Sequence, residues 1–262
     1  MLQIDQINVS IGTTNVCQNF TFNLEPSHCA VILGCNGVGK STLLRSLAGL
    51  HPLQSGSIRL NGKNIREFTP RERASNISIL FQHYDDVFPI TVYEYVRLGC
   101  STKHVAWLGD EETDAQQVAA ALAAVDLAGY ESRLLSTLSG GERRRVGLAL
   151  LLCQDTPILL LDEPSNHLDI RHQVELLTLL RTVAITRGKI ILSVMHDINL
   201  AARFNDFAWL ILGNGQSQFG PVDSVMTETN LTALYRYPIR QIADETYRLY
   251  TPSVANDLKQ NH

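Results

Sequence analysis

The feature that most constrains this chain is a glycine-rich loop that lies between a β-rich run and a helix-forming run. Residues 34–41 read Gly-Cys-Asn-Gly-Val-Gly-Lys-Ser. They fit the pattern G-x-x-x-x-G-K-[ST], in which backbone N–H groups turn inward around a phosphate. The run 28–33 precedes the loop and the amphipathic run 41–50 follows it, as a strand and a helix would. The sequence therefore predicts nucleotide binding on an α/β fold.

Within this loop, residue types match the chemistry of a triphosphate. Glycines allow the backbone to approach phosphate oxygens closely, and the helix N-terminus adds positive potential. Lys40 supplies a full positive charge to the β- and γ-phosphates, and the Ser41 hydroxyl can ligate Mg²⁺. The predicted nucleotide contacts of the loop are Gly34, Asn36, Gly37, Gly39, Lys40, Ser41 and Thr42.

A second polar site follows the apolar run 158–161, where Asp162 and Glu163 come next. In a doubly wound sheet, the carboxyl ends of the strands form the edge at which ligands bind. Asp162 is the predicted Mg²⁺ and nucleotide contact. Glu163 would face the terminal phosphate and polarise the attacking water. An acidic turn at a strand end is a plain alternative, which the phosphate loop makes less favoured.

The pattern along the chain predicts one α/β domain with an inserted helical segment. After residue 153, β-rich and helical runs alternate, which is typical of βαβ units with a parallel sheet. Between 91 and 153 only helices are expected, the first of them closed by Gly99. The expected strands are 2–11, 19–24, 28–33, 57–60, 77–81, 157–161, 189–195 and 207–212. The expected helices are 41–50, a short one from 70, 91–99, 111–127, 170–186 and 197–204.

Composition excludes several classes of protein. Twenty-two Lys and Arg against 26 Asp and Glu give a net charge of −4, so a nucleic-acid partner is not expected. Five cysteines without C-x-x-C spacing favour neither a disulfide framework nor a zinc site. The longest apolar runs are too short to span a membrane, and the first residues lack the features of a signal peptide.

The order of further motifs resembles the nucleotide-binding subunit of an ABC transporter over about residues 1–225. Residues 138–142 (Leu-Ser-Gly-Gly-Glu) resemble the family signature, and Gln82 resembles the Q-loop glutamine. Residues 165–169 resemble the D-loop, and His196 resembles the switch histidine. Taken singly, each motif can also be explained by local structure without any function. Ser139-x-x-Glu142, for example, is also an ordinary helix capping box.

The resemblance implies a P-loop NTPase core with a parallel sheet, an N-terminal antiparallel β subdomain and an inserted α-helical subdomain. The core with its β subdomain would comprise 1–90 and 154–225, the helical subdomain 91–153, and a C-terminal extension 226–262. It implies that Glu163, His196 and Gln82 are catalytic and that Ser139, Gly140 and Gly141 contact nucleotide. Mg²⁺ would be held by Ser41, Gln82 and Asp162.

The resemblance also implies partners and a place in the cell. Two copies of the chain would sandwich ATP between them, and separate integral membrane permease subunits would carry the substrate. An extracytoplasmic substrate-binding protein would complete the system, and the chain would lie at the cytoplasmic face of the inner membrane. Segments 168–173 and 196–203 resemble importers of metal chelates: iron–siderophore, haem, cobalamin, or oxyanions such as molybdate. Residues 83–89 are the candidate docking surface for the permease.

The sequence departs from the family pattern at two positions, and it leaves several alternatives open. Ile11 stands where the family usually places an aromatic ring against adenine, so weaker base discrimination is expected. Glu142 replaces the usual glutamine of the signature, and Arg143–Arg145 are interpreted mainly as a solvated helix face. The alternatives are a soluble ABC ATPase acting on ribosomes or nucleic acid, a non-hydrolysing binding module and an exporter subunit.

Overall fold

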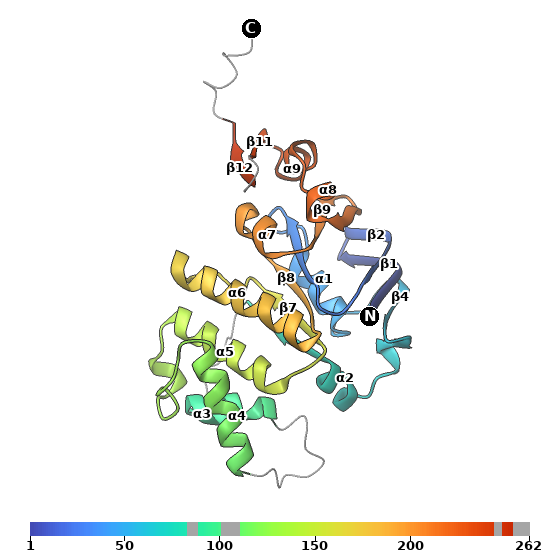
Figure 1. Ribbon diagram of the computed structural model, residues 1–262. Coiled ribbons are helices and arrows are strands. Elements are labelled where there is room, and N and C mark those ends of the chain that lie inside the picture. The colour runs from blue at the N-terminus through green and yellow to red at the C-terminus, as the bar shows by residue number, and fades with distance from the viewer. Residues whose placement is uncertain (83–88, 101–110, 244–247, 254–262) are drawn as a thin grey trace.

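The computed structural model describes residues 1–82, 89–100, 111–243 and 248–253. Most of the candidate docking segment 83–89 lies outside the described residues. Figure 1 shows three groups of elements around a central sheet: the N-terminal strands on one side, α3, α4 and α5 at one end, and the C-terminal elements at the other. None of the described helices is long and apolar enough to cross a membrane.

The central sheet has six strands in the order β10-β9-β3-β8-β7-β6. Five of them run parallel, and β10 pairs antiparallel with β9 at one edge. β3, β7 and β8 are buried at every position, as expected for strands covered on both faces. The bounds are β3 Cys29–Gly34, β6 Ile77–Leu80, β7 Ile158–Asp162, β8 Ile190–Val194, β9 Phe207–Gly213 and β10 Gln216–Pro221. The predicted parallel sheet is confirmed.

A second, antiparallel sheet is formed by the N-terminal strands in the order β2-β1-β4-β5. Its bounds are β1 Leu2–Ile11, β2 Thr14–Leu24, β4 Ser55–Leu60 and β5 Lys63–Asn64. Asn61 and Gly62 join β4 to β5 with φ values of 49° and 85°, the positive angles that a tight hairpin turn requires. The two sheets meet at Trp209, which stacks on Phe20 with ring centroids 4.8 Å apart and meets Phe22 edge-on.

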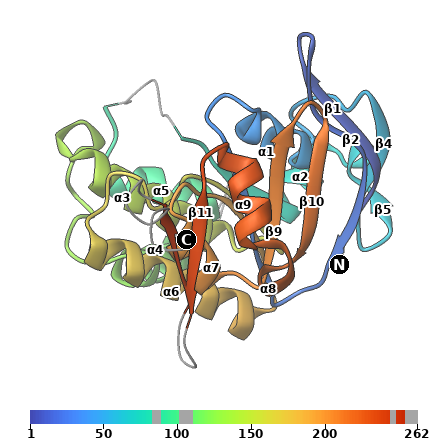
Figure 2. The ribbon, with the colours of Figure 1, turned by 90° about the horizontal axis from the view of Figure 1, so that it is seen from above.

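The helices cover the central sheet and build the inserted helical segment (Figures 1 and 2). Their bounds are α1 Lys40–Leu47, α2 Pro70–Asn76, α3 Val92–Cys100, α4 Glu111–Ala124, α5 Gly140–Gln154, α6 Ile170–Arg187, α7 Ile198–Phe204, α8 Val222–Val225 and α9 Glu228–Tyr235. Two 3₁₀ turns, Ile65–Glu67 and Leu135–Thr137, and a C-terminal hairpin, β11 Ile239–Ala243 and β12 Arg248–Pro252, complete the described chain.

The prediction that Gly99 closes the first helix of this segment is wrong. α3 continues through Gly99 to Cys100. A Cβ at Gly99 would lie 2.4 Å from the carbonyl oxygen of Leu150, so the missing side chain allows α3 to pack closely against α5. The glycine is explained by helix packing rather than by helix termination.

Buried apolar side chains form two clusters on the two faces of the central sheet. Along β3, Val31 and Leu33 belong to one cluster, and Ala30 and Ile32 belong to the other. This alternation follows from the period of two in a strand. The first cluster extends into α3, α4, α5 and α9, and the second fills the space between the central sheet and the N-terminal sheet.

Candidate functional site

The phosphate loop joins β3 to α1, and its last glycine shapes the start of the helix. Gly39 has φ 104° and occupies the N-cap position of α1, where no side chain caps the helix. A Cβ at this position would lie 2.5 Å from a methyl group of Val16. The first N–H groups of α1 therefore have no side-chain cap, and an anion can take that place.

Lys40 lies folded back over the loop. Its Nζ donates to the carbonyl oxygens of Gly34, at 2.8 Å, and Cys35, at 3.0 Å. Burial lowers the pKa of Lys40, while the nearby carboxylates of Glu163 and Asp162 act in the opposite direction. A triphosphate would offer this ammonium a stronger partner than the two carbonyl groups do.

Glu163 is the centre of a hydrogen-bonded group at the end of β7. Its carboxylate accepts from Gln82 Nε2 at 2.9 Å and from Asn166, and it lies 2.6 Å from His196 Nε2. The side chain comes from a residue with φ 55°, a left-handed backbone that a glutamate seldom adopts. Such strain persists where the surrounding structure enforces it, often at functional sites.

Asp162 provides the chemistry of a cation site. It is 3% exposed and hydrogen-bonds with the Ser41 side chain. Its Oδ1 has no hydrogen-bond partner among the described residues. Burial raises the pKa of Asp162, and the neighbouring Glu163 adds to this. A buried carboxylate oxygen without a donor beside a hydroxyl suits Mg²⁺, which prefers such oxygen ligands, so the residues fit the predicted ion.

A cavity of about 630 Å³ brings most of the predicted site together. Ile11, 42% exposed, forms an apolar wall, and no Phe, Tyr or Trp of the described chain lines the cavity. The lining residues are Ile11, Asn36, Gly37, Gly39, Lys40, Ser41, Thr42, Gln82, Glu163, Asn166 and His196. Gly34 and Asp162 lie just behind this lining, through their contacts with Lys40 and Ser41.

The predicted signature residues lie apart from this cavity. Ser139 accepts from the N–H of Glu142, and the Glu142 carboxylate accepts from the Ser139 N–H at 2.7 Å, so the capping box is formed. These bonds lower the pKa of Glu142 to about 2. Gly140 lines an adjoining cavity of about 210 Å³, which shares Gln82, Glu163 and Asn166 with the first, and Gly141 packs against Leu168.

Arg144 corrects the prediction that Arg143–Arg145 form a solvated helix face. It is only 7% exposed, and its guanidinium donates to the carbonyl oxygens of Phe81 and Asp162. Phe81 directly follows β6 and Asp162 ends β7, so the two carbonyls come immediately before Gln82 and Glu163. Arg144 therefore connects the helix that begins after Ser139 to both residues.

Sequence reasoning also left Asn166 out of the site. Its side chain donates to Glu163, and its backbone N–H donates to the Glu163 carbonyl oxygen at 3.2 Å. The available signal was the position of Asn166 three residues after Glu163, which allows a tight turn to bring the two side chains together. For Arg144, the signal was its spacing from Leu148 and Leu151, four and seven residues on, which places it on a buried face of α5.

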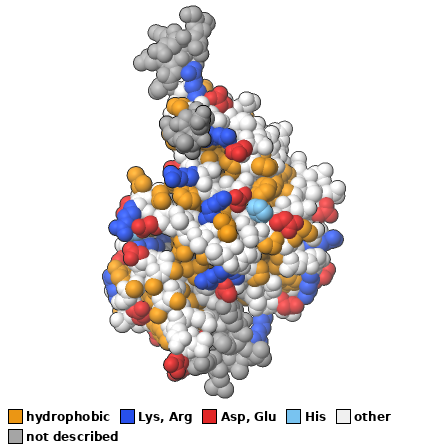
Figure 3. Space-filling view, viewed as in Figure 1, with side chains coloured by type: hydrophobic (Ala, Val, Ile, Leu, Met, Phe, Trp, Pro, Cys, Tyr) orange, Lys and Arg blue, Asp and Glu red, His pale blue; other side chains and the backbone are white. Residues whose placement is uncertain are grey.

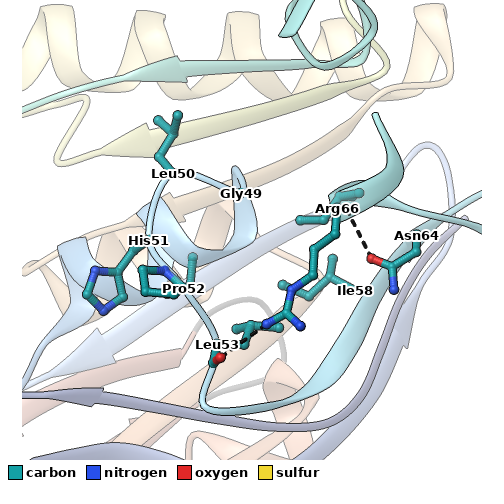
Figure 4. A pocket seen from close by; sticks show the side chains of 10 residues that line it. Gly49, Leu50, His51, Pro52, Leu53, Ile58, Asn64 and Arg66 are labelled. Carbon is teal, nitrogen blue, oxygen red and sulfur yellow. Dashed lines mark hydrogen bonds between the residues drawn. The ribbon is translucent and has the colours of Figure 1, made fainter. Parts of the chain in front are cut away.

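A separate cavity of about 280 Å³ lies at the other end of α1 (Figure 4). Leu50, Pro52 and Ile58 line it, and Arg66 donates to the Leu53 carbonyl oxygen at 3.1 Å. None of the predicted site residues lines this cavity. The predicted nucleotide contacts therefore gather at the N-terminal end of α1 and not at this cavity.

Comparisons with known proteins agree with the motif order. The ABC transporter family model matches residues 17–166. The hemin import ATP-binding protein HmuV of Rhizobium etli is 35% identical over 248 residues, 92% of each chain. The petrobactin import ATP-binding protein FpuC of Bacillus anthracis is 37% identical over 223 residues, 85% of this chain and 81% of the relative.

A solved structure extends the agreement to three dimensions. A structure described as an inward-facing conformation of a metal-chelate type ABC transporter superposes with a TM-score of 0.83 at 25% identity. The match covers 97% of this chain and 98% of the other. Family model, relatives and fold agree, and the chain belongs to the ABC transporter family as an ATP-binding, ATP-hydrolysing subunit.

Proposed function

We propose that this chain powers a membrane importer of a metal chelate, with haem and iron–siderophore complexes as the favoured substrates. The support is the similarity over most of the chain to subunits named for hemin and petrobactin import and to a metal-chelate type transporter. Cobalamin and oxyanions such as molybdate are further members of the same proposed class. Permease subunits and an extracytoplasmic substrate-binding protein would complete the system, with this chain at the cytoplasmic face of the inner membrane.

The observation that supports hydrolysis is the position of Glu163 at the phosphate-loop cavity. Its carboxylate can accept a proton from a water molecule while the water oxygen attacks the γ-phosphorus and the bond to ADP breaks. His196 and Gln82, which contact this carboxylate, would orient it and the γ-phosphate. Lys40 would hold the β- and γ-phosphates. Mg²⁺, when bound by Ser41, Asp162 and Gln82, supplies charge neutralisation on the phosphates.

We propose further that two copies enclose ATP. Ser139, Gly140 and Gly141 do not line the phosphate-loop cavity of their own chain, which leaves them available to the γ-phosphate bound by a second copy. The helical subdomain, 91–153, would then move relative to the core, 1–90 and 154–225, when the two copies close. Arg144 would transmit that movement to Gln82 and Glu163.

The test of this function is purification of the tagged chain from detergent-solubilised native membranes. We expect a stoichiometric polytopic membrane protein to co-purify, and a bound iron chelate, haem or corrinoid to identify the cargo. Glu163→Gln in the same complex should bind ATP and dimerise but lose turnover by about 1,000-fold or more. A chain that travels with ribosomes or DNA, or a Glu163→Gln complex with full hydrolysis, would contradict the proposal.

The alternative of a soluble ATPase acting on ribosomes or nucleic acid is not favoured. The relatives described above are named as import subunits. On the face shown in Figure 3, Lys and Arg side chains are interspersed with Asp and Glu, and the net charge is −4. A polyanion is usually met by a basic stripe.

A further inference from the structure

The C-terminal elements contact the region that carries His196. α8, α9, β11 and β12 follow the central sheet, and Figures 1 and 2 show α9 and the hairpin beside α7. β12 packs on α7, and α9 packs on β9 and β11. We name residues 226–243 and 248–253 the C-terminal brace.

Asn199 forms the main polar link between α7 and this brace. Its Oδ1 accepts from the Tyr250 N–H at 2.7 Å, and its Nδ2 donates to the Tyr250 carbonyl oxygen at 3.2 Å. One side-chain amide thus satisfies both backbone groups of a residue 51 positions away, as a neighbouring strand would. Asn199 lies three residues after His196, so the link acts close to the imidazole.

Tyr250 fixes the far side of this link. It is 3% exposed, and its hydroxyl donates to the Met226 carbonyl oxygen at 2.6 Å. Tyr250 also belongs to the apolar cluster that includes Met226, Leu231 and Leu234. The brace is therefore a packed unit, and Asn199 hydrogen-bonds to a residue in its buried interior rather than to an exposed segment.

The other end of the brace contacts the phosphate loop. The Cys35 Sγ donates to the Leu234 carbonyl oxygen at 3.1 Å. Burial raises the pKa of the next residue, Tyr235, to about 12, and both Cys35 and Asp197 lie near enough to add to the rise. α9 thus lies between the loop that precedes Lys40 and the residue that follows His196.

α7 depends on such contacts because it is short. It spans seven residues, and an isolated helix of that length is not stable in water. Asp197 caps it by accepting from the N–H groups of Asn199 and Leu200. The His196 side chain is 40% exposed and lies between the end of β8 and Asp197, the cap of α7. Its position therefore depends on the backbone that leads into α7 as well as on its contact with Glu163.

We propose that the C-terminal brace holds α7 in place, and that Asn199 is a positioning residue that sets His196 against Glu163 and the terminal phosphate. This inference rests on the proposed function of His196 in ATP hydrolysis. It assigns to the C-terminal extension a part in turnover, through backbone placement rather than through contact with nucleotide.

The test compares Asn199→Leu with Arg203→Ala in the full chain. Leucine keeps the approximate size of asparagine and removes both hydrogen bonds. Arg203 lies exposed on the same helix. Among the described residues its guanidinium contacts the Phe204 ring, 5.8 Å from the centroid, and no residue of the C-terminal brace, so its loss is the matched control. For Asn199→Leu we expect kcat to fall about 10- to 100-fold, since a displacement of about 1 Å has effects of that size. KM for ATP should change less than about 3-fold.

Hydrogen–deuterium exchange provides a readout that does not need turnover. In Asn199→Leu the amides of 197–204 should exchange faster than in the wild-type chain, while those of 40–47 should stay unchanged. Tyr250→Phe, which removes the hydroxyl bonds to Met226 and Arg248 and leaves both Asn199 bonds in place, should give a smaller change in the same amides. If Asn199→Leu does not fold, this second variant decides the question by itself.

Two results would overturn the inference. One is an unchanged kcat together with unchanged exchange in 197–204. The other is a parallel loss of ATP binding and thermal stability, which would make Asn199 a general stabilising residue. A wild-type complex that hydrolyses no ATP would contradict the proposed function instead, and the exchange experiment would still report whether the brace holds α7.

Discussion

Two helix N-termini near the candidate site, those of α1 and α5, differ in how their first N–H groups are satisfied. α1 begins after Gly39, with no side-chain cap. α5 begins after Ser139, and Ser139 and Glu142 form a complete capping box. The start of α1 is therefore the open end, without a side-chain acceptor, and the start of α5 is the closed end, where the N–H groups of Ser139 and Glu142 already have side-chain acceptors.

This difference in capping indicates which of the two helix N-termini depends on a bound anion. An uncapped end leaves backbone donors that only water or an anion can satisfy, and the buried ammonium of Lys40 lies beside it. A capped end is stable by itself, so an additional anion there must compete with Glu142. We therefore expect the first helix end to bind phosphate within one chain and the second to contribute only when another copy brings its nucleotide.

The largest effect on the difference between the two helix ends is expected from Gly39→Ala, which changes the open end of α1. The methyl group would meet Val16 at 2.5 Å, and φ 104° is unfavourable for alanine. We expect ATP affinity to fall by at least about 100-fold, as isothermal titration would show. Gly188→Ala is the matched control, because it also has positive φ but faces open space at the end of α6; it should leave ATP affinity unchanged. Equal effects of the two substitutions would contradict the assigned importance of the open end.

Asp162→Asn, at the open end, should make the metal-free protein more stable while it abolishes hydrolysis. Burial raises the pKa of Asp162, which means that its ionised form opposes folding at neutral pH. In protein kept free of metal, the amide should raise the free energy of unfolding by about 1–3 kcal/mol, measured by urea titration. Magnesium-dependent hydrolysis should be lost in the same variant. A less stable metal-free variant would show that the carboxylate has a partner that compensates its burial.

Ile11→Tyr should strengthen the open end by adding a ring above the loop. Ile11 lines the cavity, and stacking on a base contributes roughly 1–3 kcal/mol in nucleic-acid systems. We expect ATP to bind about tenfold more tightly and the preference for ATP over GTP to rise, measured with fluorescent nucleotide analogues in competition. If affinity and preference both stay the same, Ile11 does not lie where the base binds.

The smallest expected effect concerns the closed end, in Glu142→Gln. The pKa of Glu142 is about 2 instead of 4.5, so the ionised carboxylate stabilises the folded state above pH 4.5. This stabilisation is lost as the pH falls toward 2. Glutamine can still cap the helix, so the wild-type advantage should be only about 0.5–1 kcal/mol at pH 7. Denaturant titrations of both chains at a series of pH values should show the difference shrinking below pH 4.5.

Much of the fold could be predicted because its signals are local. The run 158–161 is apolar, ends in two carboxylates and forms the buried β7. The Thr69 and Ser139 capping boxes start helices as predicted. Most residues of the predicted site line one cavity, because strand ends and the turns after them meet at one edge of a parallel sheet.

What the sequence did not reveal depends on partners far along the chain. β10 is an exception: this edge strand of polar residues with a terminal proline follows β9 across Asn214 and Gly215, a local hairpin signal that the predicted strands left out. Arg144 has the sequence context of a surface arginine, yet its guanidinium is buried against two strand ends. From the sequence Gly99 resembles a helix C-terminus, and only its close approach to Leu150 on α5 explains why a glycine lies inside α3.

The stacking of Trp209 on Phe20, where the two sheets meet, gives the chain an optical reporter. The indole is fully buried, and the sequence contains only one other tryptophan, Trp107. A Trp107→Phe chain would therefore emit from a single indole located between the nucleotide-binding sheet and the N-terminal sheet. A red shift on addition of ATP would mean that water reaches this contact as the sheets separate. A constant spectrum would mean that both sheets turn as one body.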